Sequence, residues 1–287
     1  MVQLGILLAL TSALVANVGL LCKYRGAVAA PRVELRHPLR SAVGLFRSRW
    51  WTIGFAIAFV AWTIHVAALT VAPLSLVETT ISGGLLLLAW LAERWFGVRV
   101  GLREWLGLGL CAVGLALLAV TSAGAGSAGS SYSVEAMISF EAAAIAVGAA
   151  LLLSGTAGSP GRASGPALGI AAGLLLGVAN VAVKALTGTL PADPLSILSP
   201  WTATALLAGA GAFLALARGL QTGGAIPVIT LSAVSANLVS VGGGIAVFGD
   251  PMGSDPLAIV ARSVAFAAVI AAVAVLPAPG RSAPAHA

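Results

Sequence analysis

The chain has 287 residues, of which 59% are apolar and only 8% are charged, and its mean hydropathy is +1.04. Soluble domains carry about 25% charged residues, so this composition excludes a water-soluble globular protein. The apolar residues come in runs of about 20, the length that an α-helix needs to cross a bilayer. The sequence therefore predicts an all-α, polytopic membrane protein.

Nine apolar segments follow one another along the chain, separated by charged residues, by clusters of Gly, Ser and Pro, or by tryptophans. These segments are 2–22, 50–71, 73–93, 102–121, 134–155, 165–187, 200–219, 224–247 and 257–276. Each is close to the ~20 residues that one crossing requires. We therefore expect about nine transmembrane helices, followed by a disordered tail at 277–287.

The positions of Lys and Arg predict how these helices are oriented. Segment 23–49 carries seven basic residues and a single acidic residue, Glu34. Arginines also follow the third, fifth and seventh apolar segments, whereas the alternate connections contain neither Lys nor Arg. Positively charged loops are retained in the cytoplasm. The expected location is the cell membrane, plasma or inner, with the N-terminus outside and the C-terminus cytoplasmic.

A cleaved signal peptide is the alternative interpretation of residues 1–30, because Ala27-Val28-Ala29 resembles a cleavage site. Such a peptide begins with a basic region, and no Lys or Arg precedes Lys23, so a first transmembrane helix is favoured. The basic segment 23–49 is expected to lie on the anionic inner leaflet, where each basic residue gains about 1 kcal/mol. A role in fixing the topology is favoured there over any further function.

Motifs for other chemistry are missing from the sequence. Neither lysine is followed by Ser or Thr, which excludes a P-loop. Cys22 and Cys111 are distant from each other and are expected to be free, packed thiols. We expect no enzyme activity, no cofactor and no nucleic-acid partner. The expected partners are the bilayer and a small solute or cation, and a homo-oligomer is compatible with the sequence.

Two parts of the chain resemble each other. The tetrapeptide Val-Ala-Asn-Val occurs at 15–18 and again at 178–181, although the chain has only three asparagines, Asn17, Asn180 and Asn237. The first and sixth segments enter the membrane from opposite sides. Secondary transporters are commonly built from such inverted repeats.

The predicted organisation follows from this repeat. A first four-helix repeat covers 1–121 and includes the basic loop 23–49. A linker and a connecting fifth helix cover 122–164. The inverted second repeat covers 165–276.

The first repeat also resembles a known family. Ala72-Pro73-Leu74-Ser75-Leu76-Val77, then Leu91-Ala92-Glu93-Arg94, then Trp105-Leu106-Gly107 resemble the drug/metabolite transporter superfamily. Within it, the nine spans, the basic loop and Trp50-Trp51 with Gly54 are most similar to NIPA-type magnesium transporters. The resemblance implies alternating access by an inverted-repeat bundle.

One departure from that family concerns the substrate. The magnesium group carries an acidic residue where this chain has Trp62, and an asparagine where it has His65. Magnesium is a hard cation that prefers oxygen ligands, usually carboxylates. An organic solute is therefore favoured over magnesium, and no metal ligand is assigned.

Ionisable side chains within spans are the first candidates for a substrate or coupling-ion site. The candidates are His65, Glu78, Glu141, Lys184 and Arg262, together with Asn17, Asn180, Asn237 and Trp62. At a rise of ~1.5 Å per residue, the five ionisable groups lie roughly 5–10 Å below the outer ends of their helices. This common depth predicts a polar cavity open to the outside.

Glu78 is the first choice for the coupling carboxylate, because a buried carboxyl group can load and release a proton. Structural ion pairs between Glu78 and Arg262, or between Glu141 and Lys184, are the alternative. His65 could accept a proton or simply donate a hydrogen bond to a carbonyl. With Trp62 it shares one helix face, which suits an aromatic wall or ordinary core packing.

The sequence thus predicts a secondary transporter that moves a metabolite or drug-like solute by alternating access, coupled to protons or by exchange. A transporter of Mg²⁺ or another divalent cation is one alternative. A non-transporting partner subunit or a component of a lipid flippase is the other. A hydrated central cavity that reaches Glu78 would favour a carrier, and closed charge pairs would favour a scaffold.

Overall fold

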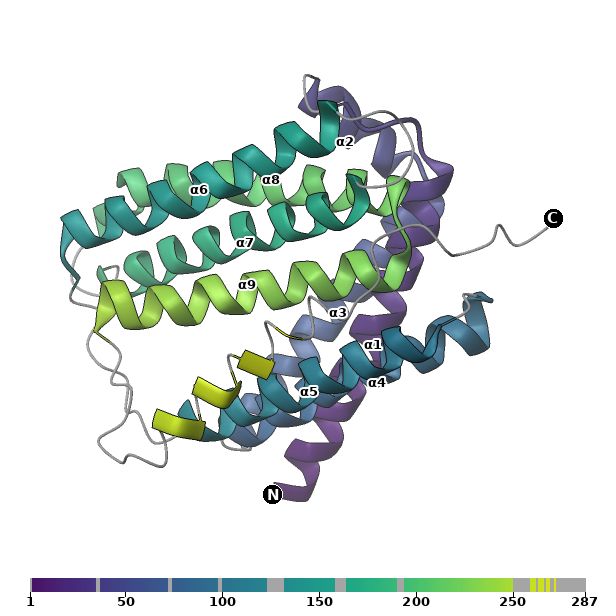
Figure 1. Ribbon diagram of the computed structural model, residues 1–287, viewed down its shortest axis with the longest axis horizontal. Helices are drawn as coiled ribbons and strands as arrows, with labels where there is room; N and C mark the ends of the chain where they lie inside the picture. Colours follow the sequence, from purple (N-terminus) through teal and green to yellow (C-terminus); the bar gives the residue numbers. More distant parts are fainter. Residues whose placement is uncertain are drawn as a thin grey trace.

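The computed structural model describes residues 2–34, 37–71, 74–97, 100–122, 132–157, 164–189 and 194–249, with isolated residues between 259 and 271. The described chain is all-helical (Figure 1). Its long helices are α1 (Val2–Ala29), α3 (Arg49–Val71), α4 (Leu74–Phe96), α5 (Leu102–Ser122), α6 (Val134–Ala157), α7 (Ser164–Thr189), α8 (Pro200–Thr222) and α9 (Ala225–Phe248). Two short elements are α2 (Pro38–Phe46) and the 3₁₀-helix η1 (Pro194–Leu198).

Five helices within the described residues are long and apolar enough to cross a membrane. They are Gln3–Ala29 in α1, Val134–Ser154 in α6, Gly165–Leu186 in α7, Pro200–Thr222 in α8 and Ala225–Phe248 in α9. A bilayer offers no hydrogen-bond partners to the backbone, so apolar segments satisfy their own N–H and C=O groups as helices. The chain is therefore a multi-pass membrane protein. The predicted segment 257–276 falls largely, and the tail 277–287 wholly, outside the described residues.

The N-terminal helix is longer than predicted, because α1 continues through Ala29 instead of ending at residue 22. Lys23 and Arg25 are therefore helical and do not begin a loop. The Lys23 ammonium lies 5.3 Å from the ring centre of Phe55, and the Arg25 guanidinium lies 4.4 Å from that of Trp50. Aromatic faces attract cations, and long basic side chains cover apolar surface with their stems. These contacts with α3 explain why two charged residues extend the helix.

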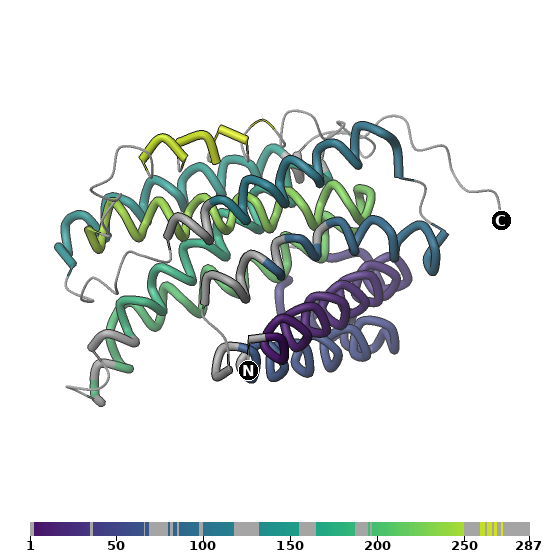
Figure 2. Tube along the Cα trace, turned by 90° about the horizontal axis from the view of Figure 1, so that it is seen from below, coloured from purple at the N-terminus to yellow at the C-terminus, as the bar shows by residue number. Residues whose placement is uncertain are grey.

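The long helices pack in two sets. In the first, α1 contacts both α3 and α4, while α5 packs on α4. In the second, α7 contacts both α8 and α9, while α6 packs on α7. Helices α6 to α9 run side by side in Figure 1, and α1 crosses them steeply in that view. Figure 2 shows α1 alongside α3.

Glycines permit the closest helix contacts. A methyl group at Gly26 in α1 would overlap the backbone of Trp51 in α3. In α7, a methyl group at Gly169 would approach Val228 O to 2.9 Å, and one at Gly177 would approach Val239 Cβ to 2.5 Å. Small residues spaced by four place two helix backbones in direct contact along one face. Gly169, Gly173 and Gly177 of α7 thus allow close contact with α9.

One end of the molecule is tied together by Gln221, near the end of α8. Its amide nitrogen donates to Ala27 O at 2.9 Å and to Pro31 O at 3.0 Å, and its amide oxygen accepts from Val33 N at 2.9 Å. A single side chain thus joins α8 to the segment between α1 and α2. The basic segment 23–49, which we expect on the inner leaflet, is therefore partly folded against the protein.

Replacing Gln221 with Leu is expected to lower the free energy of unfolding by about 1.5–4.5 kcal/mol, because three hydrogen bonds are lost and each contributes about 0.5–1.5 kcal/mol. The measurement is thermal unfolding of the detergent-solubilised protein. Thr222→Val is the matched control, since the Thr222 hydroxyl donates to Arg218 O within its own helix at 3.0 Å. Equal melting temperatures for the two variants would contradict a tie made by Gln221.

Candidate functional site

Glu141 is the only charged side chain that is fully buried within the described residues, with 4% of its surface exposed. It lies on the face of α6 that also buries Met137 and Gly148, at spacings of four and seven residues that fall on one side of a helix. Met137 packs in a cluster with Val181, and Gly148 faces Leu175. Along α6, Glu141 therefore lies between two apolar contacts with α7, one at Met137 and one at Gly148.

The carboxyl group of Glu141 has an unsatisfied oxygen. Oε1 has no hydrogen-bond partner among the described residues. Lys184 is half-buried in α7, and its ammonium lies 4.4 Å from the ring centre of Phe248. A buried polar group without a partner costs about 1–3 kcal/mol, and a functional role is one explanation for keeping it.

The two asparagines of the repeated tetrapeptide both bind a neighbouring helix. Asn17 is 6% exposed, and its amide donates to Gly84 O of α4 at 2.6 Å. The Asn180 amide donates to Ser240 Oγ of α9 at 3.2 Å, from a more exposed position. Asn237 instead donates to Ala233 O of its own helix at 2.9 Å. Asn17 and Asn180 thus connect helices, whereas the Asn237 contact is local.

The other candidates are distributed over several helices. Trp62 is 58% exposed and packs on Phe59 of its own helix, with ring centres 5.9 Å apart. His65, one turn further along α3, is half-buried. Glu78 belongs to α4, but its side chain lies outside the described part, as does Arg262. The predicted Glu78–Arg262 pair and the cavity reaching Glu78 thus involve residues that the structure does not describe.

The sequence analysis did not single out the hydroxyl groups of α9. Thr230, Ser232 and Ser235 are buried, and the Thr230 hydroxyl has no hydrogen-bond partner among the described residues. A methyl group at Gly173 of α7 would overlap Ser232 O and approach Ser235 Cβ, so this part of α9 faces α7. Short hydroxyl residues among Ala, Gly and Val resemble packing residues in a sequence. Only their burial against α7 distinguishes them.

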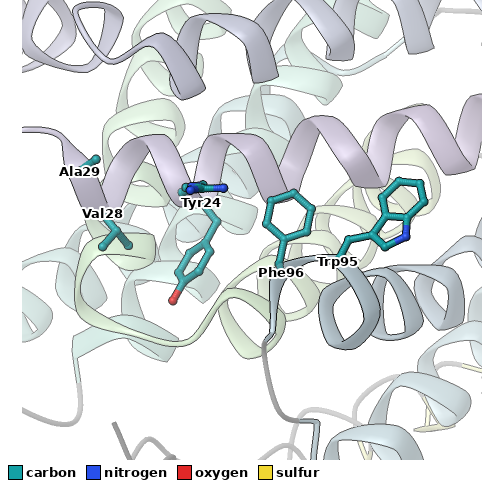
Figure 3. A pocket seen from close by; sticks show the side chains of 6 residues that line it. Tyr24, Val28, Ala29, Trp95 and Phe96 are labelled. Atoms are coloured by element: carbon teal, nitrogen blue, oxygen red, sulfur yellow. The ribbon is translucent and has the colours of Figure 1, made fainter. Parts of the chain in front are cut away.

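Two cavities lie near the Gln221 end. The first, of about 440 Å³, lies between the ends of α1 and α4 and is lined by Tyr24, Val28, Trp95 and Phe96 with Arg25 and Ala29 (Figure 3). The second, of about 630 Å³, lies beside α2 and has Arg32, Arg40 and Arg47 among its lining residues. Cys22 and Cys111 are free and buried, as expected. The described residues contain no group of three or more His, Cys, Asp or Glu side chains placed to hold a metal ion.

No protein-family model, curated protein or solved structure matches this chain. The class is therefore defined by the fold itself, as an all-helical, multi-pass membrane protein. Its most unusual chemical feature is one buried carboxyl group within a membrane-spanning helix. Ionisable groups inside membrane spans are rare and commonly mark ion or substrate pathways.

Proposed function

We propose that this protein is a secondary transporter built from two inverted four-helix repeats, the second completed by segment 257–276. The observation that carries the proposal is the shared packing of the two helix sets. In each set, the first helix contacts the next two long helices, while those two barely contact each other: α1 with α3 and α4, and α7 with α8 and α9.

The helix directions agree between the two sets. Ser12 donates to Ala61 O, whereas Gly26 approaches Trp51, so α1 and α3 are antiparallel. Asn17 contacts Gly84 near the middle of both helices, and the C-terminal ends of α1 and α4 line one cavity. These two helices are therefore parallel. In the second set, α7 is antiparallel to α8 and parallel to α9, as its glycine contacts indicate. Two sets with one arrangement support an internal repeat.

The contacts at the Gln221 end support an inverted relation between the repeats. Gln221 binds Ala27 at the C-terminal end of α1, and Gly165 at the N-terminal end of α7 packs against Gly223. The first helix of one set therefore ends where the first helix of the other begins. Asn17 and Asn180 add to this support, because each hydrogen-bonds from the first helix of its set to the third.

The cargo we propose is a small organic solute, a metabolite or drug-like compound, moved by proton coupling or exchange. Glu141 supports proton coupling, because its carboxyl group is buried and its Oε1 has no hydrogen-bond partner among the described residues. Such a group can take up a proton when it is shielded from water and release the proton when water reaches it. Glu78, the first choice from the sequence, remains a candidate for the coupling carboxylate. We propose transport in preference to enzyme activity, and an orientation in which the basic Gln221 end is cytoplasmic. Membership of the drug/metabolite transporter superfamily is part of this proposal.

The test is flux in proteoliposomes that contain the purified protein, with a panel of labelled metabolites, cationic drugs and Mg²⁺, with and without a pH gradient. We expect at least one organic solute to move roughly tenfold faster than in protein-free liposomes. A pH gradient or a counter-solute should increase its accumulation. Movement of Mg²⁺ alone would contradict the organic cargo, and no movement of any panel member in either direction would contradict a transporter.

A further inference from the structure

A basic cup lies beside α2 at the end that we assign to the cytoplasm. The cavity of about 630 Å³ is lined by Arg32, Arg40 and Arg47, with His37 and Glu34 among the other lining residues. Arg218 of α8 lies close enough to Arg32 for their charges to repel each other. Three guanidinium groups against one carboxyl group give the cup a net positive charge, which suits an anionic ligand.

The cup is held in shape by contacts that do not use its arginines. The Ser41 hydroxyl accepts from Glu34 N at 2.9 Å and donates to Glu34 O at 3.0 Å. Val33 N donates to Gln221, and Leu45 is fully buried in the core shared by α1, α3 and α8. The described backbone at Val33, Glu34 and α2 is therefore anchored to the rest of the protein. A preformed site loses little conformational entropy when its ligand binds.

One side of α2 adds an exposed apolar strip to the cup. Leu39 is 82% exposed and Val43 is 55% exposed, and both line the same cavity. A spacing of four places them on one face of the helix, away from the buried Ser41 and Leu45. A short helix with an apolar outer face and flanking arginines is typical of elements that lie at a membrane surface. A free anion would use the arginines but not this apolar strip.

We propose that the cup binds the phosphate headgroup of an anionic phospholipid, with the acyl chains against Leu39 and Val43. Guanidinium groups bind phosphate through paired charge-assisted hydrogen bonds, and the inner leaflet is the source of anionic lipid at this end. The inference rests on the orientation proposed above but not on transport. The sequence alone predicts a general attraction of the basic segment to the anionic leaflet. The present proposal is narrower, because it assigns one lipid-binding site to named residues.

The experiment measures lipid retention and thermal stability of the full-length protein in nanodiscs of phosphatidylcholine, with or without phosphatidylglycerol. We expect phosphatidylglycerol to remain bound in native mass spectra and to raise the melting temperature. Arg40→Gln and Arg47→Gln should each weaken retention about fivefold, the effect of one basic residue at a lipid surface. Arg103→Gln is the matched control, because Arg103 is exposed at the start of α5 and does not line the cup.

Further arms separate the lipid from other ligands. Leu39→Gln should weaken phosphatidylglycerol retention while leaving the arginines in place. Inorganic phosphate added to phosphatidylcholine nanodiscs should give no comparable stabilisation, and an equal effect would identify a free-anion site and overturn the lipid proposal. Equal retention by Arg40→Gln, Arg47→Gln and Arg103→Gln would overturn it as well. None of these experiments measures transport. A failure of the lipid proposal can therefore be told apart from a failure of the transporter proposal.

Discussion

Replacing Glu141 with Leu is expected to raise the melting temperature of the protein by roughly 5 °C and to abolish the proton-driven transport that we propose. The stabilising part follows from burial, because the side chain is 4% exposed and its Oε1 has no hydrogen-bond partner among the described residues. An unsatisfied polar group in such surroundings costs about 1–3 kcal/mol, which an apolar side chain of similar length removes. Met137 and the α7 layer already provide apolar neighbours for the leucine.

The loss of coupling follows from the chemistry of the carboxyl group. Leucine cannot carry a proton, so accumulation driven by a pH gradient should fall to the level of protein-free liposomes. Glu135→Leu is the matched control, since Glu135 is exposed in the first turn of the same helix. A Glu141→Leu protein that melts at a lower temperature would show that the carboxyl group has a structural partner. Unchanged proton-driven flux in this variant would remove Glu141 from the mechanism.

Replacing Gly173 with Leu is expected to lower the free energy of unfolding by about 3 kcal/mol or more, which corresponds to a fall of roughly 10 °C in melting temperature. A first side-chain carbon at this position already overlaps Ser232 O and lies 2.7 Å from Ser235 Cβ. The overlap is with backbone, so it can be relieved only if α7 and α9 separate. Separation would also expose Thr230 and the other buried hydroxyl groups of α9.

Gly209→Leu provides the comparison for this substitution. Gly209 lies within α8, and a methyl group there meets no atom within 4 Å. The same change of residue type should therefore leave the melting temperature nearly unaltered. The measurement is thermal unfolding of both variants in one detergent. A similar loss of stability in both would mean that the cost comes from the leucine itself and not from the contact between α7 and α9.

Most of the helices could be predicted from sequence, because a run of about 20 apolar residues has few alternatives to a helix in a bilayer. Glycines four residues apart, as in α7, are typical of close helix contacts, but they do not tell which helix is the partner. Helix α2 escaped prediction, because its nine residues lie among arginines in a segment that reads as polar. Only the burial of Leu45 and Val33 against distant helices reveals that this segment is folded.

The importance of Glu141 was harder to predict. Helix α6 is apolar on every side, so its sequence gives no periodicity that distinguishes a buried face from a lipid-facing one. The sequence placed Glu141 among the candidates, but only the structure shows that it is buried while Glu135 of the same helix is exposed. The contact of α6 with α7 makes the difference, and such contacts depend on residues far away in the chain.

The Gln221 amide has a consequence for the kinetics of the proposed transport cycle. Its three hydrogen bonds bridge the two helix sets at the end of the molecule where the arginines gather. One amide group makes all three hydrogen bonds. Any movement that separates the two helix sets at this end must therefore break the three bonds at the same time and replace them with hydrogen bonds to water. The three hydrogen bonds should therefore add to the activation barrier for opening the protein at this end, and Gln221→Leu should lower that barrier.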